Sequence, residues 1–136
     1  MSQVLNQDSQ ELVMMAAGAA DEKNALDIQI LDIDKLSNIA NYFLICSGAS
    51  VRQTKTIAEE IVRKLKSVEE RPFKSAGDNK GEWIVIDYGH FVVHVFTEEM
   101  RDYYQLERLW KDAPKLEFDS HSDRSSAADL GELKDP

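Results

Sequence analysis

The stretch "WIVIDYGHFVVHVF", residues 83–96, consists of two apolar runs on either side of Gly89-His90. A Gly-X pair between two such runs suits a type II′ turn, so we expect a β-hairpin with strands at 83–88 and 91–96. A two-residue turn also sets the register of the hairpin. Across one face, this register pairs Trp83 with Phe96, Val85 with His94, and Asp87 with Val92.

The two faces of this hairpin differ in chemistry. One face is wholly apolar and must lie in the core: it pairs Ile84 with Val95, Ile86 with Val93, and Tyr88 with Phe91. The opposite face mixes large apolar groups with the Asp87 carboxylate and the His94 imidazole. Two interpretations stay open for this second face. Either a helix covers it and His94 is a core residue, or the part around Trp83 and Asp87 meets a partner.

His90 and His94 have the H-x-x-x-H spacing that forms metal sites on helices. In the predicted hairpin, however, four residues of strand span roughly 13 Å. One ion bound at about 2 Å from each ligand cannot bridge that distance, so we expect no metal site. We expect His90 to be solvated at the tip of the turn, so that replacing it with Ala changes stability little.

Patterns on both sides of the hairpin predict an alternation of helices and strands. Upstream we expect a helix at 10–23 capped by Ser9, a half-buried strand at 25–33, a central strand at 41–47 covered on both faces, a helix at 51–66 capped by Ser50, and a short edge strand at 71–74. Downstream, Thr97 is expected to cap a last helix that ends at Pro114.

The length and composition suit one domain. A chain of 136 residues with 43% hydrophobic content can bury a real core. We expect an α/β fold, a single compact domain at residues 1–114 with a mixed sheet of about five strands flanked by helices. Residues 115–136 have many acidic and small side chains and few apolar ones, which is typical of a disordered acidic tail that the fold does not need.

The charge balance favours a protein partner. The net charge is −9, from 25 acidic and 16 basic side chains, and this charge repels phosphate backbones. We therefore expect little direct binding to nucleic acid. Cys46 is the only cysteine, which excludes an internal disulfide and favours a reducing compartment. We find no signal peptide and no apolar run of the roughly 18 residues that a membrane span needs, so we expect a cytoplasmic protein.

The predicted last helix has an apolar surface about twice as wide as one core contact needs. On a helical wheel, Tyr103, Leu106 and Trp110 share one face, which we assign to the core. Met100 and Tyr104 project from an adjacent face, and the clearly polar stripe consists of Arg101, Gln105 and Arg108. Either the helix is wedged between two elements, or Met100 and Tyr104 are exposed anchors for a partner.

Two short patterns are similar to parts of a phosphotransfer site. Asp32-x-Asp34 has a spacing that can hold a divalent cation, and "SGAS" at 47–50 precedes a predicted helix and can cradle a phosphate. A nucleotidyltransferase-like site places the Gly-Ser turn before its paired carboxylates, and here the order is reversed. Activity would also need Asp32, Asp34 and Ser50 within about 5 Å. We predict neither catalysis nor a cofactor, with a phosphotransfer enzyme as the alternative.

The motifs "ALDIQILDI", "NYFLICSGAS", "IAEEI", "DYG", "VVHVF" and "YYQLERLW" follow one another between residues 9 and 113. Together and in this order, they resemble the ribosomal silencing factor family, also called Iojap-like. The signature positions that match are Trp83, Asp87, Tyr88, Gly89, His94, Arg101, Tyr103, Tyr104, Leu106, Glu107 and Trp110. The chain departs from the family pattern at Asn41 and His90, where the family usually has an acid.

The resemblance implies a mixed α/β domain that is related in shape to nucleotidyltransferases but lacks their catalysis. It also implies binding to the large ribosomal subunit through its protein L-fourteen, which blocks joining of the small subunit and lowers translation when nutrients are scarce. We take as candidate partner-binding residues Trp83, Asp87, Tyr88, Met100 and Tyr104. Whether the free protein forms a homodimer stays open.

Overall fold

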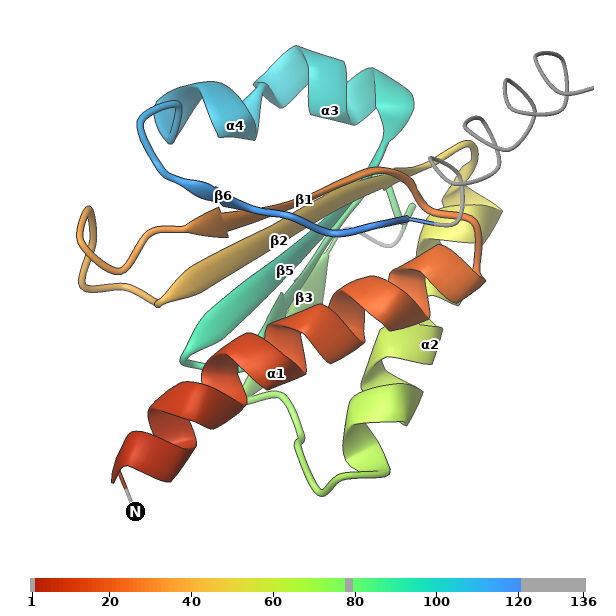
Figure 1. Cartoon of the computed structure of the whole chain (residues 1–136). Coiled ribbons are helices and arrows are strands. Elements are labelled where there is room, and N and C mark those ends of the chain that lie inside the picture. Colours follow the sequence, from red (N-terminus) through yellow and green to blue (C-terminus); the bar gives the residue numbers. More distant parts are fainter. Residues whose placement is uncertain (1, 78–79, 121–136) are drawn as a thin grey trace, which may run out of the picture.

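One mixed sheet runs through the middle of the molecule (Figure 1). The computed structural model describes residues 2–77 and 80–120, and within them the sheet has six strands in the order β3-β4-β5-β2-β1-β6. These strands are β1 (Leu26–Asp32), β2 (Tyr42–Gly48), β3 (Lys74–Gly77), β4 (Trp83–Asp87), β5 (Phe91–Thr97) and β6 (Lys115–Leu116). Of the neighbouring pairs, β2 and β5 are parallel and the others are antiparallel. The predicted α/β class is confirmed.

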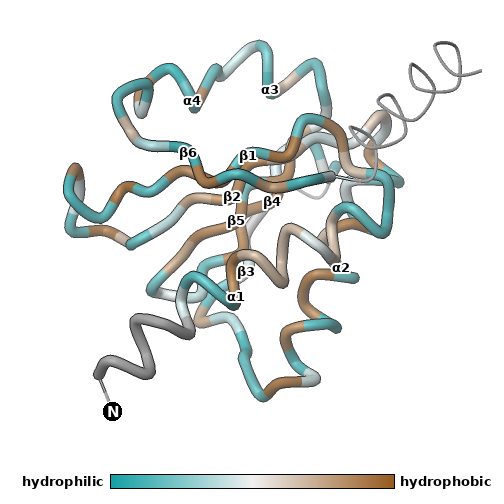
Figure 2. Tube along the Cα trace, viewed as in Figure 1, coloured by the Kyte–Doolittle hydropathy of each residue, from teal (hydrophilic) through white to brown (hydrophobic). Residues whose placement is uncertain are grey.

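Helices cover both faces of the sheet (Figure 1). α1 (Ser2–Glu22) and α2 (Val51–Lys66) lie on one face, and the shorter α3 (Glu98–Tyr104) and α4 (Leu106–Leu109) lie on the other. Each helical layer encloses its own cluster of buried apolar side chains. Figure 2 shows the hydrophobic residues concentrated along the central strands, between these layers.

The hairpin of β4 and β5 has the predicted register: Trp83 pairs with Phe96, Val85 with His94, and Asp87 with Val92. Its apolar face lies in the core on the α1–α2 side, as expected. Gly89 has φ +88°, and a Cβ at this position would clash with the ring of Phe73. Only glycine combines this backbone conformation with so close an approach of another ring.

The central strand β2 is also as predicted. Phe43 and Ile45 enter the cluster on the α3–α4 side, whereas Leu44 and Cys46 enter the cluster on the α1–α2 side. α2 begins where its capping residue predicts, since Ser50 Oγ accepts a hydrogen bond from the Gln53 backbone N–H at 3.1 Å. The Gln53 side chain in turn accepts from the Ala49 backbone N–H at 2.6 Å, which completes a reciprocal cap.

Three predictions about the elements that precede the hairpin were wrong. Ser9 does not cap α1, because the helix begins at Ser2 and Ser9 is buried within it. β1 is half-buried only at its start: the pairing with β2 is irregular between Leu26 and Gln29, and Ile30 and Leu31 are then buried on opposite faces of the sheet. The edge strand β3 begins at Lys74, after Pro72, rather than at residue 71.

The predicted tail begins too early. Lys115 and Leu116 form β6, which pairs with Leu31 and Ile30 of β1, and Phe118 then packs against the core on the α1–α2 side. This segment folds because β1 offers it backbone hydrogen-bonding groups and a neighbouring apolar surface, which composition alone does not reveal. The sheet therefore has a sixth strand. Residues 121–136 lie outside the described residues, so the prediction for them stays a prediction.

The last helix is broken rather than continuous. Gln105 has φ 48° and ψ 52°, the left-handed conformation, and it separates α3 from α4. The break changes the direction of the chain, so a single helical wheel does not describe residues 98–113. After the break, Leu106 and Trp110 turn back onto the core on the α3–α4 side.

Candidate functional site

Three aromatic side chains gather where α3 ends above β4. Trp83 stacks on Phe96 with ring centroids 4.9 Å apart, and the ring of Tyr104 lies 4.7 Å from that of Trp83. Tyr103 meets Tyr104 edge-on at 5.0 Å. We call Trp83, Tyr103 and Tyr104 the aromatic cluster. It joins β4 to α3, which the chain brings together through the β4–β5 hairpin.

The aromatic cluster faces solvent. Tyr103 is 75% exposed and Tyr104 is 48% exposed, and Leu109 on the neighbouring α4 is also exposed. Our assignment of Tyr103 to the core was wrong, because it assumed that the helix continues unbroken beyond Tyr104. The exposed anchor predicted at Tyr104 is found, and Met100 lies half-buried one turn earlier on α3, against the core.

His94 lies beneath Trp83 and is 7% exposed. Its Nδ1 accepts a hydrogen bond from the Trp83 Nε1–H at 3.2 Å, and its ring meets Phe43 edge-on at 4.9 Å. Burial lowers the pKa of His94 to about 4, although the Asp87 carboxylate raises it in part. The imidazole is therefore neutral at pH 7 with its proton on Nε2, a buried atom for which the described residues supply no acceptor. The burial of His94 agrees with the core interpretation.

The other candidate residues lie apart from the aromatic cluster. Asp87 is four residues along β4 from Trp83, roughly 13 Å away, and its carboxylate accepts from the Gly89 backbone N–H at 2.7 Å. Tyr88 is 3% exposed in the core on the α1–α2 side, where burial raises its pKa to about 12. So deeply buried a side chain offers a partner almost no surface, which weighs against Tyr88 as a contact residue.

Arg101 is the polar residue that the helical wheel misplaced. We expected it on the polar stripe of the last helix, but its side chain is 7% exposed. Its guanidinium donates to Glu107 at 2.8 Å and to Ser47 Oγ at 2.9 Å, and it lies 3.4 Å from an Asp27 carboxylate oxygen. Arg101 thus ties α3 to α4, β1 and β2. The spacing of Arg101 and Glu107, six residues apart across a helix break, carries no signal in the sequence.

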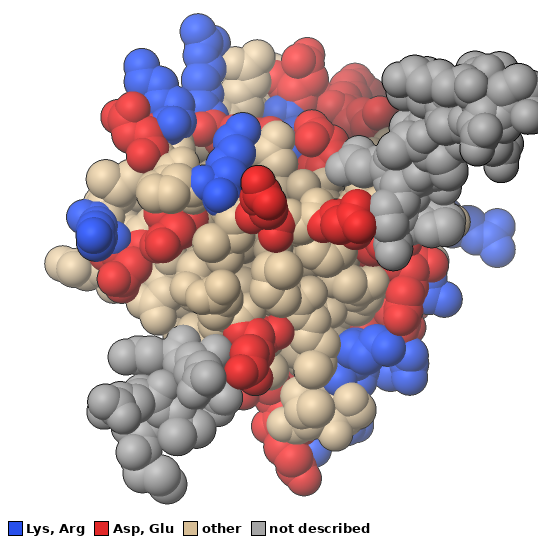
Figure 3. Space-filling model, in the orientation of Figure 1, with Lys and Arg blue, Asp and Glu red and all other residues tan. Residues whose placement is uncertain are grey.

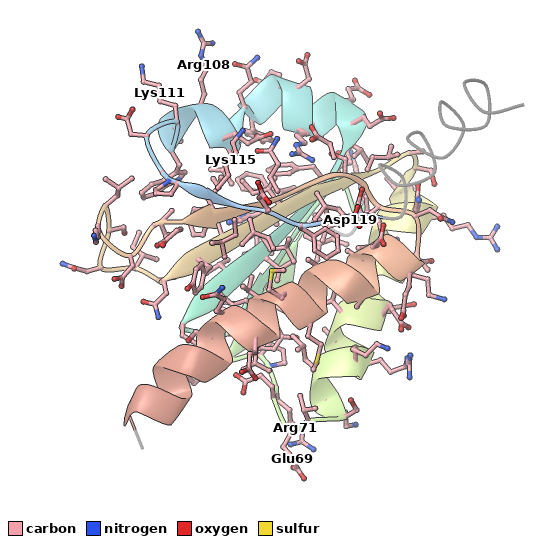
Figure 4. All side chains as sticks on the ribbon, viewed as in Figure 1. Glu69, Arg71, Arg108, Lys111, Lys115 and Asp119 are labelled. Carbon is pink, nitrogen blue, oxygen red and sulfur yellow. The ribbon has the colours of Figure 1, made fainter. Side chains whose placement is uncertain are left out.

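A cavity of about 550 Å³ lies beside Arg101, between β1 and the α3–α4 layer. Its lining includes four acidic and four basic side chains, among them the paired Arg101 and Glu107. Arg108 and Lys111 line its rim, and Figure 4 shows both pointing away from the sheet, while Lys115 comes from β6 below them. Because the lining holds equal numbers of acidic and basic side chains, the cavity favours neither anions nor cations strongly.

The residues of the alternative phosphotransfer site do not converge. Asp32 pairs with Tyr42 at the start of β2, whereas Ser50 follows the end of that strand. Six residues of strand separate these ends by roughly 20 Å. Cys46 offers no nucleophile either, because burial raises its pKa to about 12 even though Arg101 opposes that shift. Within the described residues, no three His, Cys, Asp or Glu side chains form a group that could hold a metal ion.

His90 is held by the fold and is not solvated as we predicted. Its Nδ1 is hydrogen-bonded to Ser9 Oγ of α1, and its Nε2 lies 3.0 Å from Glu70 Oε2 in the segment after α2. Figure 4 shows that segment at the lower end of the molecule, where the neighbouring Glu69 and Arg71 are labelled. His90 therefore connects the turn of the hairpin to α1 and to the segment that follows α2.

Replacing His90 with Ala should lower the free energy of unfolding by about 1–2 kcal/mol, because two side-chain hydrogen bonds are lost at about 1 kcal/mol each. Thermal unfolding measures this change. Ser9→Ala should lose about half as much, and the double variant should be no less stable than His90→Ala alone. If His90→Ala melts within about 1 °C of the unsubstituted protein, the contacts contribute nothing and the original expectation of a tolerant site is restored.

Comparison with known proteins decides the family. Residues 6–134 match the family model described as "Ribosomal silencing factor during starvation". The chain belongs to the ribosomal silencing factor family. It is 42% identical over 115 residues to the ribosomal silencing factor of Bacillus subtilis, which covers 85% of this chain and 96% of that relative. A crystal structure of a protein from Chromobacterium violaceum superposes with a TM-score of 0.73 at 33% identity, covering 84% of this chain and 96% of that one.

The chain is also similar to a protein named for ribosome assembly. The mouse protein "Mitochondrial assembly of ribosomal large subunit protein 1" is 32% identical over 92 residues, which are 65% of this chain and 40% of that protein. The names of the bacterial relatives describe a regulator of the ribosome and not an enzyme. Among the helices of residues 2–77 and 80–120, none has the length and apolar content to cross a bilayer.

Proposed function

We propose that this protein binds the large ribosomal subunit in the cytoplasm, through ribosomal protein L-fourteen, and blocks association with the small subunit. In this role it represses translation when nutrients are limited, as a binding regulator and not as an enzyme. Membership of the ribosomal silencing factor family supports the ribosome as target, and the mouse relative's name supports the large subunit.

The exposed aromatic cluster is the main observation that supports a docking site at the end of α3. Aromatic residues, Met and Arg are enriched at the centres of protein interfaces. Trp83, Tyr103 and Tyr104 form a continuous series of ring contacts on the surface, with Met100 beside them on α3. A surface of this kind gives a partner apolar area with little side-chain freedom to lose on binding.

Charge favours a protein rather than RNA as the direct contact. The net charge of −9 repels the phosphate backbone and attracts a basic protein surface. On the face seen in Figure 3, basic side chains alternate with acidic ones and form no continuous strip. A strip of positive charge is what tracking along a phosphate backbone requires.

The proposal predicts a hot spot at Tyr104. Tyr104→Ala should weaken binding to isolated large subunits about thirtyfold, since truncating an aromatic at an interface centre costs about 2 kcal/mol or more. Its melting temperature should change little, because Tyr104 is nearly half exposed. Sedimentation with separated subunits measures the binding, and light scattering measures subunit joining.

The matched control is Phe73→Ala. Phe73 is an aromatic that is 84% exposed just before β3, away from α3, so its loss should leave binding unchanged. Equal binding of the unsubstituted protein to both subunits would defeat the proposal, as would normal subunit joining at saturating protein. Equal losses from Phe73→Ala and Tyr104→Ala would remove the aromatic cluster from the docking site.

A further inference from the structure

The indole of Trp83 is held by ring contacts with Phe96, Tyr104 and His94 and by one hydrogen bond. Phe96 stacks beneath it and Tyr104 lies against it, and both contacts allow the ring to slide or turn by small amounts. The hydrogen bond from Trp83 Nε1–H to His94 Nδ1 is directional. It therefore distinguishes one orientation of the indole from the others that a side chain at a strand surface can adopt.

His94 is itself fixed in place. It is buried, it lies on β5 directly opposite Val85, and its ring meets Phe43 edge-on. A buried and packed acceptor is a rigid reference point for a neighbouring side chain that is only half-buried. The bond also uses the indole N–H, so that Trp83 offers an approaching surface its ring and not a hydrogen-bond donor.

We propose that His94 is a positioning residue, which holds the Trp83 ring in the orientation that docking requires. The proposal rests on the proposed function, since it assigns Trp83 to the docking surface. If His94 has this role, binding depends on a hydrogen-bond acceptor at the δ position of residue 94. This dependence is separate from the stability that the residue contributes to the core. The partner group at Trp83 is then apolar or cationic, because a ring face attracts such groups and the N–H is already bonded.

The acceptor can be removed or kept by single substitutions. His94→Leu has a similar volume without an acceptor, His94→Asn keeps an oxygen at the δ position, and His94→Gln moves the acceptor one bond further out. We expect His94→Leu and His94→Gln to bind isolated large subunits about tenfold more weakly, and His94→Asn to bind within about threefold of the unsubstituted protein. Val93→Ala, on the same strand but facing the α1–α2 side, is the control for general destabilisation and should bind normally.

The free protein provides a second measurement. The indole N–H resonance of Trp83, assigned with Trp83→Phe, should shift and exchange faster with solvent in His94→Leu, while His94→Asn keeps it near its original position. Rescue by Asn in both measurements supports the proposal. It is overturned if Asn is as weak as Leu, or if His94→Leu binds normally while Trp83→Ala does not. Normal binding of Trp83→Ala would instead remove Trp83 from the docking site and so defeat the assignment on which the proposal rests.

Discussion

Arg101→Met is expected to lower the free energy of unfolding by about 3 kcal/mol. The guanidinium is buried, and its removal leaves Glu107 and Ser47 without the donor that they share. The cost lies at the lower end of the range for buried ion pairs, because the Asp27 and Glu107 side chains are partly exposed and regain some hydration. Urea unfolding at pH 7 measures the change.

Two variants test the reason for this loss. Arg71→Met removes an arginine whose ion pair with Glu69 is exposed on both sides, and it should change the melting temperature little. The double variant Arg101→Met, Glu107→Leu should recover part of the stability, because it no longer leaves a carboxylate without its partner. An Arg101→Met protein as stable as Arg71→Met would mean that the buried network contributes no net stability.

Ending the chain after Pro114 should lower the melting temperature by about 10 °C. This truncation removes β6 and with it the partly buried side chains of Leu116 and Phe118, which pack against the core on the α1–α2 side. Burial of two such side chains contributes about 2–3 kcal/mol, and 1 kcal/mol corresponds to roughly 4 °C for a domain of this size. Calorimetry of the truncated protein measures both quantities.

A second truncation, after Ser120, tests whether β6 is the source of the lost stability. It retains β6 and every described residue beyond it, so it should melt within about 2 °C of the full chain. If both truncations melt at the temperature of the full chain, β6 is not part of the cooperative fold. If both melt equally low, residues beyond Ser120 carry the stability instead.

Local patterns predicted the parts of the fold that depend on local physics. The turn at Gly89, the register of the hairpin and the cap at Ser50 each involve residues close in the chain, and each is confirmed. β6 was missed because a two-residue strand has no periodicity of its own. It exists only because β1 presents an unpaired edge, and nothing near Lys115 in the sequence indicates that edge.

The candidate site was predicted only in part, because some of its contacts depend on residues far apart in the chain. Trp83 and Tyr104 were selected and do meet, although they come from different elements. The error at Tyr103 and the misplacement of Arg101 share one cause, the left-handed residue Gln105, which is not a glycine and so gave no sign of a break. The contacts of His90 with Ser9 and Glu70 are long-range and likewise have no signature in the sequence.

The two outer strands of the sheet also bear on aggregation. A strand at an edge presents unpaired backbone groups that can recruit another chain, and natural proteins limit this with short edges, proline and lysine. Here β3 and β6 have four and two residues, Pro72 and Pro114 precede them, and each begins with a lysine. β6 in particular shields β1, whose apolar sequence would otherwise be a ready template for intermolecular pairing. The segment from Lys115 to Ser120 thus serves two ends, since it adds buried apolar surface to the domain and keeps the edge of β1 from pairing with another molecule.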